Sequence, residues 1–155
     1  MRTIQSWLDE YGESHRSVAN KSIHWVCVPL IMLSLIGLLW SIPVPHTFAE
    51  VSPLLNWGVL FLILALIYYY LLAWRLALGM TIVSVIMIAI IFGASLSSIP
   101  LWLLSVIVFV IAWIGQFIGH KIEGKKPSFF KDIQFLLIGP LWLLAFLYQR
   151  LRLAY

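Results

Sequence analysis

Residues 101–123 read LWLLSVIVFVIAWIGQFIGHKIE. The apolar run Leu101–Gly119 is close to the ~20 residues that a helix needs to cross a bilayer, and His120-Lys121-Ile122-Glu123 follows it directly. His120 and Glu123 are three residues apart, so both lie on one face of the predicted helix. Because ionisable residues are costly at a membrane boundary, we interpret the pair as a candidate nitrogen and oxygen ligand set for one cation.

The composition of the chain is that of an integral membrane protein. Of its 155 residues, 63% are hydrophobic and 10% are charged, and the mean hydropathy is +1.01. A soluble domain is roughly half apolar and about a quarter charged. The length fits one membrane-embedded domain, residues 1–155. The formal charge of +4 sits on short loops, which suits anionic lipid headgroups better than nucleic acid.

Four apolar runs predict four membrane-spanning helices. We expect the second and third to form a tight antiparallel hairpin, because only a few residues separate them. The runs are Ile23–Ser41, Leu54–Trp74, Met80–Leu96 and Leu101–Gly119.

The N-terminal segment predicts a short helix that lies in the membrane interface. Its apolar residues recur at helical spacing and its acidic residues lie off that stripe, as in interfacial helices; the stripe is Ile4, Trp7, Leu8 and Tyr11. The predicted helix ends near Gly12 or one turn later. The segment lacks the continuous apolar core of a signal peptide.

The C-terminal apolar stretch Ile133–Leu147 is interrupted by Gly139-Pro140. A fifth crossing would place Arg150 and Arg152 outside, whereas a hairpin bent at the proline keeps them inside. We therefore favour four spans with a C-terminal re-entrant or interfacial hairpin over five spans. The predicted fold class is an all-α membrane helical bundle with an N-terminal interfacial helix.

The distribution of basic residues predicts the orientation. The loop Lys121–Lys131 is the most basic segment, and basic loops face the cytoplasm. Alternation of four spans then puts both termini and Arg75 on that side, and the turns 42–53 and 97–100 outside. Without an export signal, a bacterial inner membrane or the endoplasmic reticulum remains open.

Three of the four histidines are expected at the cytoplasmic end of the bundle. His24 begins the first span, His120 ends the fourth, and His15 precedes a bend that we place at Asn20, a candidate helix N-cap. His46 falls on the opposite side and is predicted to be a loop residue. Two interpretations of this end stay open. The three histidines and Glu123 converge to bind a metal ion, or they form a polar cluster with a structural role only.

Other polar residues near this end are candidates for supporting roles. Gln116 lies one turn before His120 on the same face, as a substrate contact or a support for a ligand. Arg16 and Lys21 could hold a substrate carboxylate or lipid headgroups, and Asn20 could serve the site as well as the helix end.

The residue types limit the metal. One cysteine, Cys27, excludes a cysteine-based zinc cluster, whereas imidazoles with a carboxylate suit Fe(II), Zn or Mn. Three other hypotheses stay open: an electron carrier with a haem held by two histidines, a zinc hydrolase, and a non-enzymatic membrane scaffold or transporter. The oligomeric state has no signal in the sequence.

Two spaced polar blocks resemble a known family. The first is the frame Y-x3-H-x4-N-x3-H, formed by Tyr11, His15, Asn20 and His24 with Pro29 beyond; the second is G-H-x2-E-x3-P, residues 119–127. Both resemble the Fe(II)-dependent 2-hydroxy fatty acid dioxygenases, typified by the yeast endoplasmic-reticulum enzyme of phytosphingosine breakdown, with bacterial relatives.

The resemblance covers essentially the whole chain. It implies α-oxidation, in which O2 and a long-chain 2-hydroxy fatty acid give the fatty acid one carbon shorter and CO2. His15, His24 and His120 match the histidines expected to bind Fe(II). Glu123 and Asn20 match further motif positions. We expect Glu123 as a fourth iron ligand, with two alternatives open, in which it orients a ligand or pairs with a lysine, and we expect Asn20 in the catalytic set.

Overall fold

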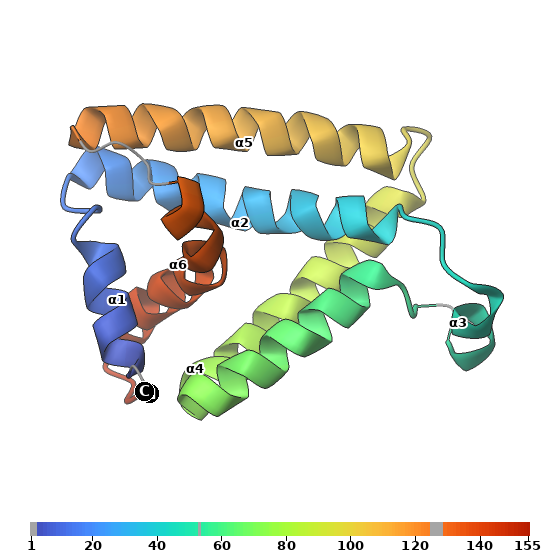
Figure 1. Ribbon diagram of the computed structural model, residues 1–155, viewed down its shortest axis with the longest axis horizontal. Coiled ribbons are helices and arrows are strands. Elements are labelled where there is room, and N and C mark those ends of the chain that lie inside the picture. Colours follow the sequence, from blue (N-terminus) through green and yellow to red (C-terminus); the bar gives the residue numbers. More distant parts are fainter. Residues whose placement is uncertain (1–2, 53, 125–128) are drawn as a thin grey trace.

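The protein is described here from a computed structural model, which covers residues 3–52, 54–124 and 129–155 and the side chains of these residues except Ala49 and residues 129–134. Within these residues every regular element is an α-helix (Figure 1). The helices are α1 (Ile4–Gly12), α2 (Val18–Trp40), α3 (His46–Val51), α4 (Trp57–Ser95), α5 (Leu101–Glu123) and α6 (Phe129–Arg150).

Helices α2 and α5 form a closely packed antiparallel pair, with α5 along one edge of the molecule (Figure 1). Gly115 and Gly119 stand four residues apart on α5, and small residues at this spacing let two membrane helices approach closely. A methyl group at Gly115 would lie 2.6 Å from Cys27 Sγ, and one at Gly119 would collide with Asn20 Oδ1. The close approach brings the end of α5 against the start of α2.

Helix α4 is broken at Ala73, where φ is −160° and ψ is 85°. Leu62 and Met87 belong to one buried cluster, although a straight helix would separate them by ~37 Å. The Tyr70 hydroxyl also lies 3.1 Å from Thr81 Oγ1. The chain therefore folds back at Ala73, and residues 57–72 and 74–95 are two arms that lie side by side (Figure 1). This is the predicted tight hairpin between the second and third apolar runs.

Helices α1 and α6 pack together on one side of the bundle. Helix α1 starts at the predicted stripe, with Thr3 as its N-cap, and buries Leu8 and Tyr11. Helix α6 continues through Gly139-Pro140, so the predicted reversal of the chain at the proline is wrong. The Tyr69 hydroxyl donates to the Leu137 carbonyl oxygen at 2.8 Å and ties α6 to the first arm of α4.

Three helices, α2, α4 and α5, are long and apolar enough to cross a membrane. Their outer faces are apolar, and Leu71, Ile82 and Ile111 are 84%, 64% and 61% exposed. Such contiguous exposed apolar surface is typical of lipid contact. Lys125, Lys126 and Pro127 of the predicted basic loop and motif lie outside the described residues.

We predict that Tyr69→Phe lowers the free energy of unfolding by about 1 kcal/mol, because it removes a buried interhelical hydrogen bond. Unfolding of the full chain in detergent micelles measures this value. Tyr70→Phe is the matched control, since Tyr70 is 43% exposed and its bond to Thr81 is exposed. Equal effects of the two substitutions would contradict the role of Tyr69 in holding α6.

Candidate metal centre

Three histidines from three segments converge at one end of the α2–α5 pair. Their ligand nitrogens lie within 4.8 Å of one another. The ring centroids are 4.2 Å apart for His15 and His24, 5.2 Å for His24 and His120, and 5.6 Å for His15 and His120. The exposed fractions are 3%, 1% and 9% for His15, His24 and His120. The sequence predicted this grouping, and the geometry confirms that the three side chains meet.

Backbone carbonyl groups fix the tautomers of two of these rings. His15 Nδ1 lies 2.6 Å from the Tyr11 carbonyl oxygen, and His24 Nδ1 lies 2.9 Å from that of Asn20. A carbonyl oxygen only accepts, so each Nδ1 carries the proton and each Nε2 keeps its lone pair. His15 Nε2 is buried and has no hydrogen-bond partner among the described residues. This is the state in which a histidine binds a metal, with its other nitrogen held by a carbonyl.

Burial lowers the pKa of His15 to about 4, and this effect outweighs the hydrogen bond to the Tyr11 carbonyl, which raises the pKa. The positive charges of His120, when protonated, and of Lys21 lower it further. A buried imidazole loses hydration when it is charged, so the neutral form is favoured. At neutral pH, His15 needs to lose no proton before it binds a cation.

Glu123 connects the end of α5 to the linker between α1 and α2. Its carboxylate accepts from the backbone N–H groups of Arg16 and Ser17, both at 2.9 Å, and from Asn20 Nδ2 at 3.2 Å. Both carboxylate oxygens are thus used by neighbours of His15, and the described metal-ligating group contains the three histidines only. These bonds hold the linker against α5, and we propose this role for Glu123 in place of the expected role of iron ligand.

Asn20 lies inside α2 and is not its N-cap, which is Ser17. The prediction placed the bend between His15 and His24 at Asn20; the chain turns at residues 13–17 instead, before the helix begins. Asn20 is fully buried, and its Nδ2 donates to the Ser14 carbonyl at 3.1 Å as well as to Glu123. Asn20 therefore fixes both ends of the turn that carries His15.

Aromatic side chains form one wall of the site. The Tyr11 ring stacks on His15 with centroids 4.2 Å apart and an angle of 11° between the planes. Trp142 of α6 lies 5.5 Å from both rings. Trp142 and the two glycines of α5 were not among the predicted site residues, although the spacing of Gly115 and Gly119 was a readable signal for close helix packing.

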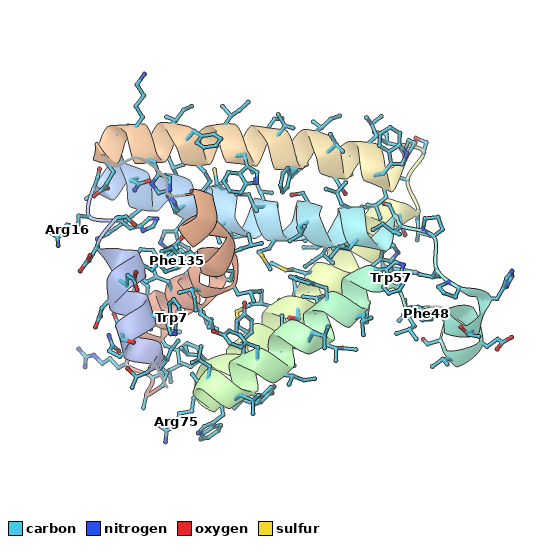
Figure 2. The ribbon with its side chains drawn as sticks, viewed as in Figure 1. Trp7, Arg16, Phe48, Trp57, Arg75 and Phe135 are labelled. Atoms are coloured by element: carbon cyan, nitrogen blue, oxygen red, sulfur yellow. The ribbon has the colours of Figure 1, made fainter. Side chains whose placement is uncertain are left out.

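The remaining predicted residues differ in position. Gln116 is buried one turn before His120 on the inner face of α5. Arg16 is exposed, and its side chain points away from the bundle (Figure 2), whereas Lys21 is half-buried and its charge acts on His15. His46 is exposed on α3, at the far end from α1 (Figure 1). It begins a six-residue helix instead of lying in a loop, and it is outside the cluster as expected.

The three imidazoles fit a single metal ion. Metal–nitrogen bonds are ~2 Å long, so a shift of about an ångström brings all three nitrogens onto one ion. Imidazoles suit iron, zinc and copper. A porphyrin held between two of these histidines has no space, because the third ring stands 4.2 Å from His24 and α2 packs directly on α5.

We predict that the imidazole of His15 in metal-free protein titrates near pH 4, well below the ordinary value of 6.5. Nuclear magnetic resonance of histidine-labelled protein in micelles measures the midpoint. The spectrum of His15→Gln assigns the signal. A midpoint near 6.5 would contradict the burial of His15 in the folded protein.

Comparison with known proteins agrees with this geometry. No curated protein and no solved structure matches the chain at a significant level. A family model described as 2-hydroxy-palmitic acid dioxygenase Mpo1-like matches residues 1–151. This match spans the linker with His15, the start of α2 with His24 and the end of α5 with His120. The chain therefore belongs to the Mpo1-like family.

Proposed function

We propose that this protein is an Fe(II)-dependent dioxygenase that oxidises a long-chain 2-hydroxy fatty acid to the fatty acid one carbon shorter. The observation that carries the proposal is the convergence of three buried histidine nitrogens within 4.8 Å in a chain of a family described by that activity. Among metals that accept imidazole ligands, iron supports oxygen chemistry when coordination positions stay open, and the activity in the family description points to iron over zinc.

The reaction balances without another reductant. R-CHOH-COOH and O2 give R-COOH, CO2 and water, and all four electrons come from the substrate. When bound by His15, His24 and His120, Fe(II) supplies oxygen chemistry and Lewis acidity toward the substrate hydroxyl and carboxylate. The protein supplies the position of the substrate and the neutral state of the ligands.

The residues around the histidines have distinct positioning roles in this proposal. The carbonyl groups of Tyr11 and Asn20 orient His15 and His24, and Glu123 holds the linker. Of the two basic residues predicted near the site, Lys21 is better placed than Arg16 to pair with a substrate carboxylate, because Lys21 is close enough to His15 for its positive charge to lower the pKa of that ring. Such a pair would be charge-assisted. Gln116, buried on the inner face of α5, is a candidate substrate contact.

We also propose that α2, both arms of α4 and α5 each cross the membrane. The arms 57–72 and 74–95 are ~24 and ~33 Å long, and their connecting turn carries Arg75. In Figure 1 this turn lies at the same end of the bundle as the start of α2 and the end of α5. The positive-inside rule puts that end, and the histidines, on the cytoplasmic side of a bacterial inner membrane or the endoplasmic reticulum.

We predict that His120→Ala removes stoichiometric iron and lowers O2 consumption with 2-hydroxypalmitate by ~100-fold or more, because loss of a ligand costs at least as much as loss of its supporting groups. Elemental analysis of anaerobically purified protein and an oxygen electrode measure both quantities. His46→Ala, at the other end of the molecule (Figure 1), is the control and retains both.

An active His120→Ala protein that keeps its metal would overturn the assignment. Stoichiometric zinc with oxygen-independent activity would favour a hydrolase instead. A Soret band in the absorption spectrum would favour a haem electron carrier.

A further inference from the structure

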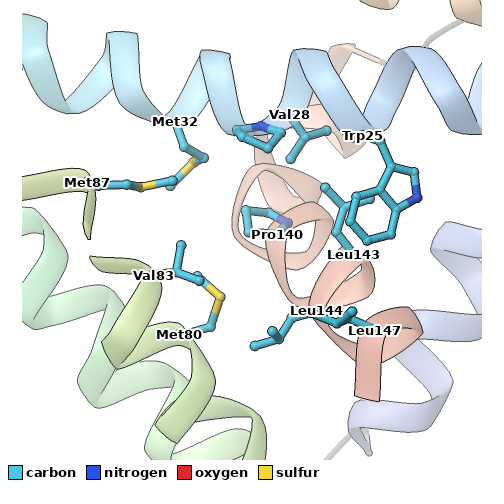
Figure 3. Close-up of a pocket in the computed structure, with 11 residues that line it drawn as sticks. Trp25, Val28, Met32, Met80, Val83, Met87, Pro140, Leu143, Leu144 and Leu147 are labelled. Carbon is cyan, nitrogen blue, oxygen red and sulfur yellow. The ribbon is translucent and has the colours of Figure 1, made fainter. Parts of the chain in front are cut away.

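An apolar cavity of about 170 Å³ lies between α2, the second arm of α4 and α6 (Figure 3). All of its lining side chains are apolar. Met32, Met80 and Met87 line the side toward α4, and Pro140 and Leu143 of α6 line the other (Figure 3). Methionine is flexible and adapts its shape to what it contacts, so this wall suits a ligand recognised by shape and apolar surface.

The cavity has a closed end and a more exposed end. Met32 and Met87 belong to one buried cluster and have exposed fractions of 3% and 6%. Trp25 and Leu147 are 39% and 40% exposed. A ligand would therefore enter beside Trp25 and end against Met32 and Met87.

The cavity lies on the same face of α2 as the metal centre. His24, Val28 and Met32 are spaced by four residues, so they form one stripe along the helix, and Val28 and Met32 line the cavity. Met32 is ~12 Å along the helix from His24.

A second set of contacts joins the two regions through α6. A methyl group at Gly139 would lie 3.0 Å from the Tyr11 hydroxyl and 3.6 Å from Val28 Cγ1. Tyr11 in turn stacks on His15. The same turn of α6 thus touches the aromatic wall of the site and the wall of the cavity.

We infer that this cavity binds the acyl tail of the substrate and that Met32 and Met87 at its closed end limit the tail length. The inference rests on the proposed function, which places the carboxylate end of the substrate at the histidines. An apolar protein cavity of ~150 Å³ holds benzene, so this cavity takes about six carbons of one narrow chain. The volume of the cavity fits one such chain and is too small for the two chains of a membrane lipid.

The test is the binding of saturated 2-hydroxy fatty acids, from hydroxyoctanoic to hydroxyoctadecanoic acid, to the full protein in micelles under argon. Displacement of a fluorescent fatty acid gives each Kd without turnover. Met87→Phe fills the closed end. If the phenylalanine side chain displaces two methylenes of the acyl tail from the cavity, the Kd of hydroxyhexadecanoic acid rises about 15-fold, because each CH2 contributes a factor of about four. Hydroxyoctanoic acid, whose tail ends short of Met87, keeps its Kd.

Two further variants separate the effect from misfolding. Ile86→Phe is the matched control, because Ile86 precedes Met87 but is 53% exposed, and it leaves the Kd profile unchanged. Met87→Ala enlarges the closed end and shifts the tightest binding to longer chains, which a folding defect would not do.

Identical chain-length profiles in wild type, Met87→Phe and Met87→Ala would overturn the inference even if the enzyme consumes O2. Displacement of the probe by a two-chain phospholipid as strongly as by a fatty acid would also overturn it and assign the cavity to a bilayer lipid. Shifted profiles without any O2 consumption would leave the cavity assignment standing and remove the proposed reaction.

Discussion

The carboxylate of Glu123 is the constraint on which the candidate metal centre depends. It accepts hydrogen bonds from Arg16, Ser17 and Asn20, the residues that follow His15 in the chain. His15 lies on a linker, which has no regular hydrogen-bond ladder of its own, whereas His24 and His120 are held by helices. The three bonds fix this linker to the end of α5, and hydrogen bonds to a charged group are stronger than neutral ones. One acidic residue thereby sets the position of the third histidine.

The α2–α5 packing is the second requirement of the site. Gly115 and Gly119 allow contact with Cys27 and Asn20, so that the next residue, His120, comes within 5.2 Å of His24 between ring centroids. The same helix α2 carries the centre at its start and the apolar cavity farther along one face. This order, polar at the helix end and apolar inside, matches an amphiphilic acid whose carboxylate stays at the membrane boundary and whose tail enters the bundle.

The sequence predicted structure well where the spacing of residues reflects one face of a helix. It predicted poorly the residue roles that depend on tertiary packing. Apolar periodicity predicted α1 and the apolar runs, and the spacing of Gln116, His120 and Glu123 placed them on one face of α5. Gly139-Pro140 suggested a reversal, but α6 continues through it, because the loss of one N–H donor at a proline is tolerated when neighbouring helices pack around it. Asn20 is a residue type that often caps helices, but it lies inside α2 and not at its N-cap. The hydrogen bonds of Glu123 to the linker and to Asn20 join residues that are 103 to 107 positions apart in the sequence. No local rule predicts contacts at that separation.

The central proposal is that three imidazoles, and no protein carboxylate, would bind one iron ion. X-ray absorption at the iron edge of anaerobically loaded protein tests it most directly, because imidazole rings give characteristic outer-shell scattering. We expect the scattering of three imidazoles in the wild type and the same shell in Glu123→Ala, with weaker iron binding in the variant. Two or fewer imidazoles, or a shell that loses an oxygen ligand in Glu123→Ala, would contradict it.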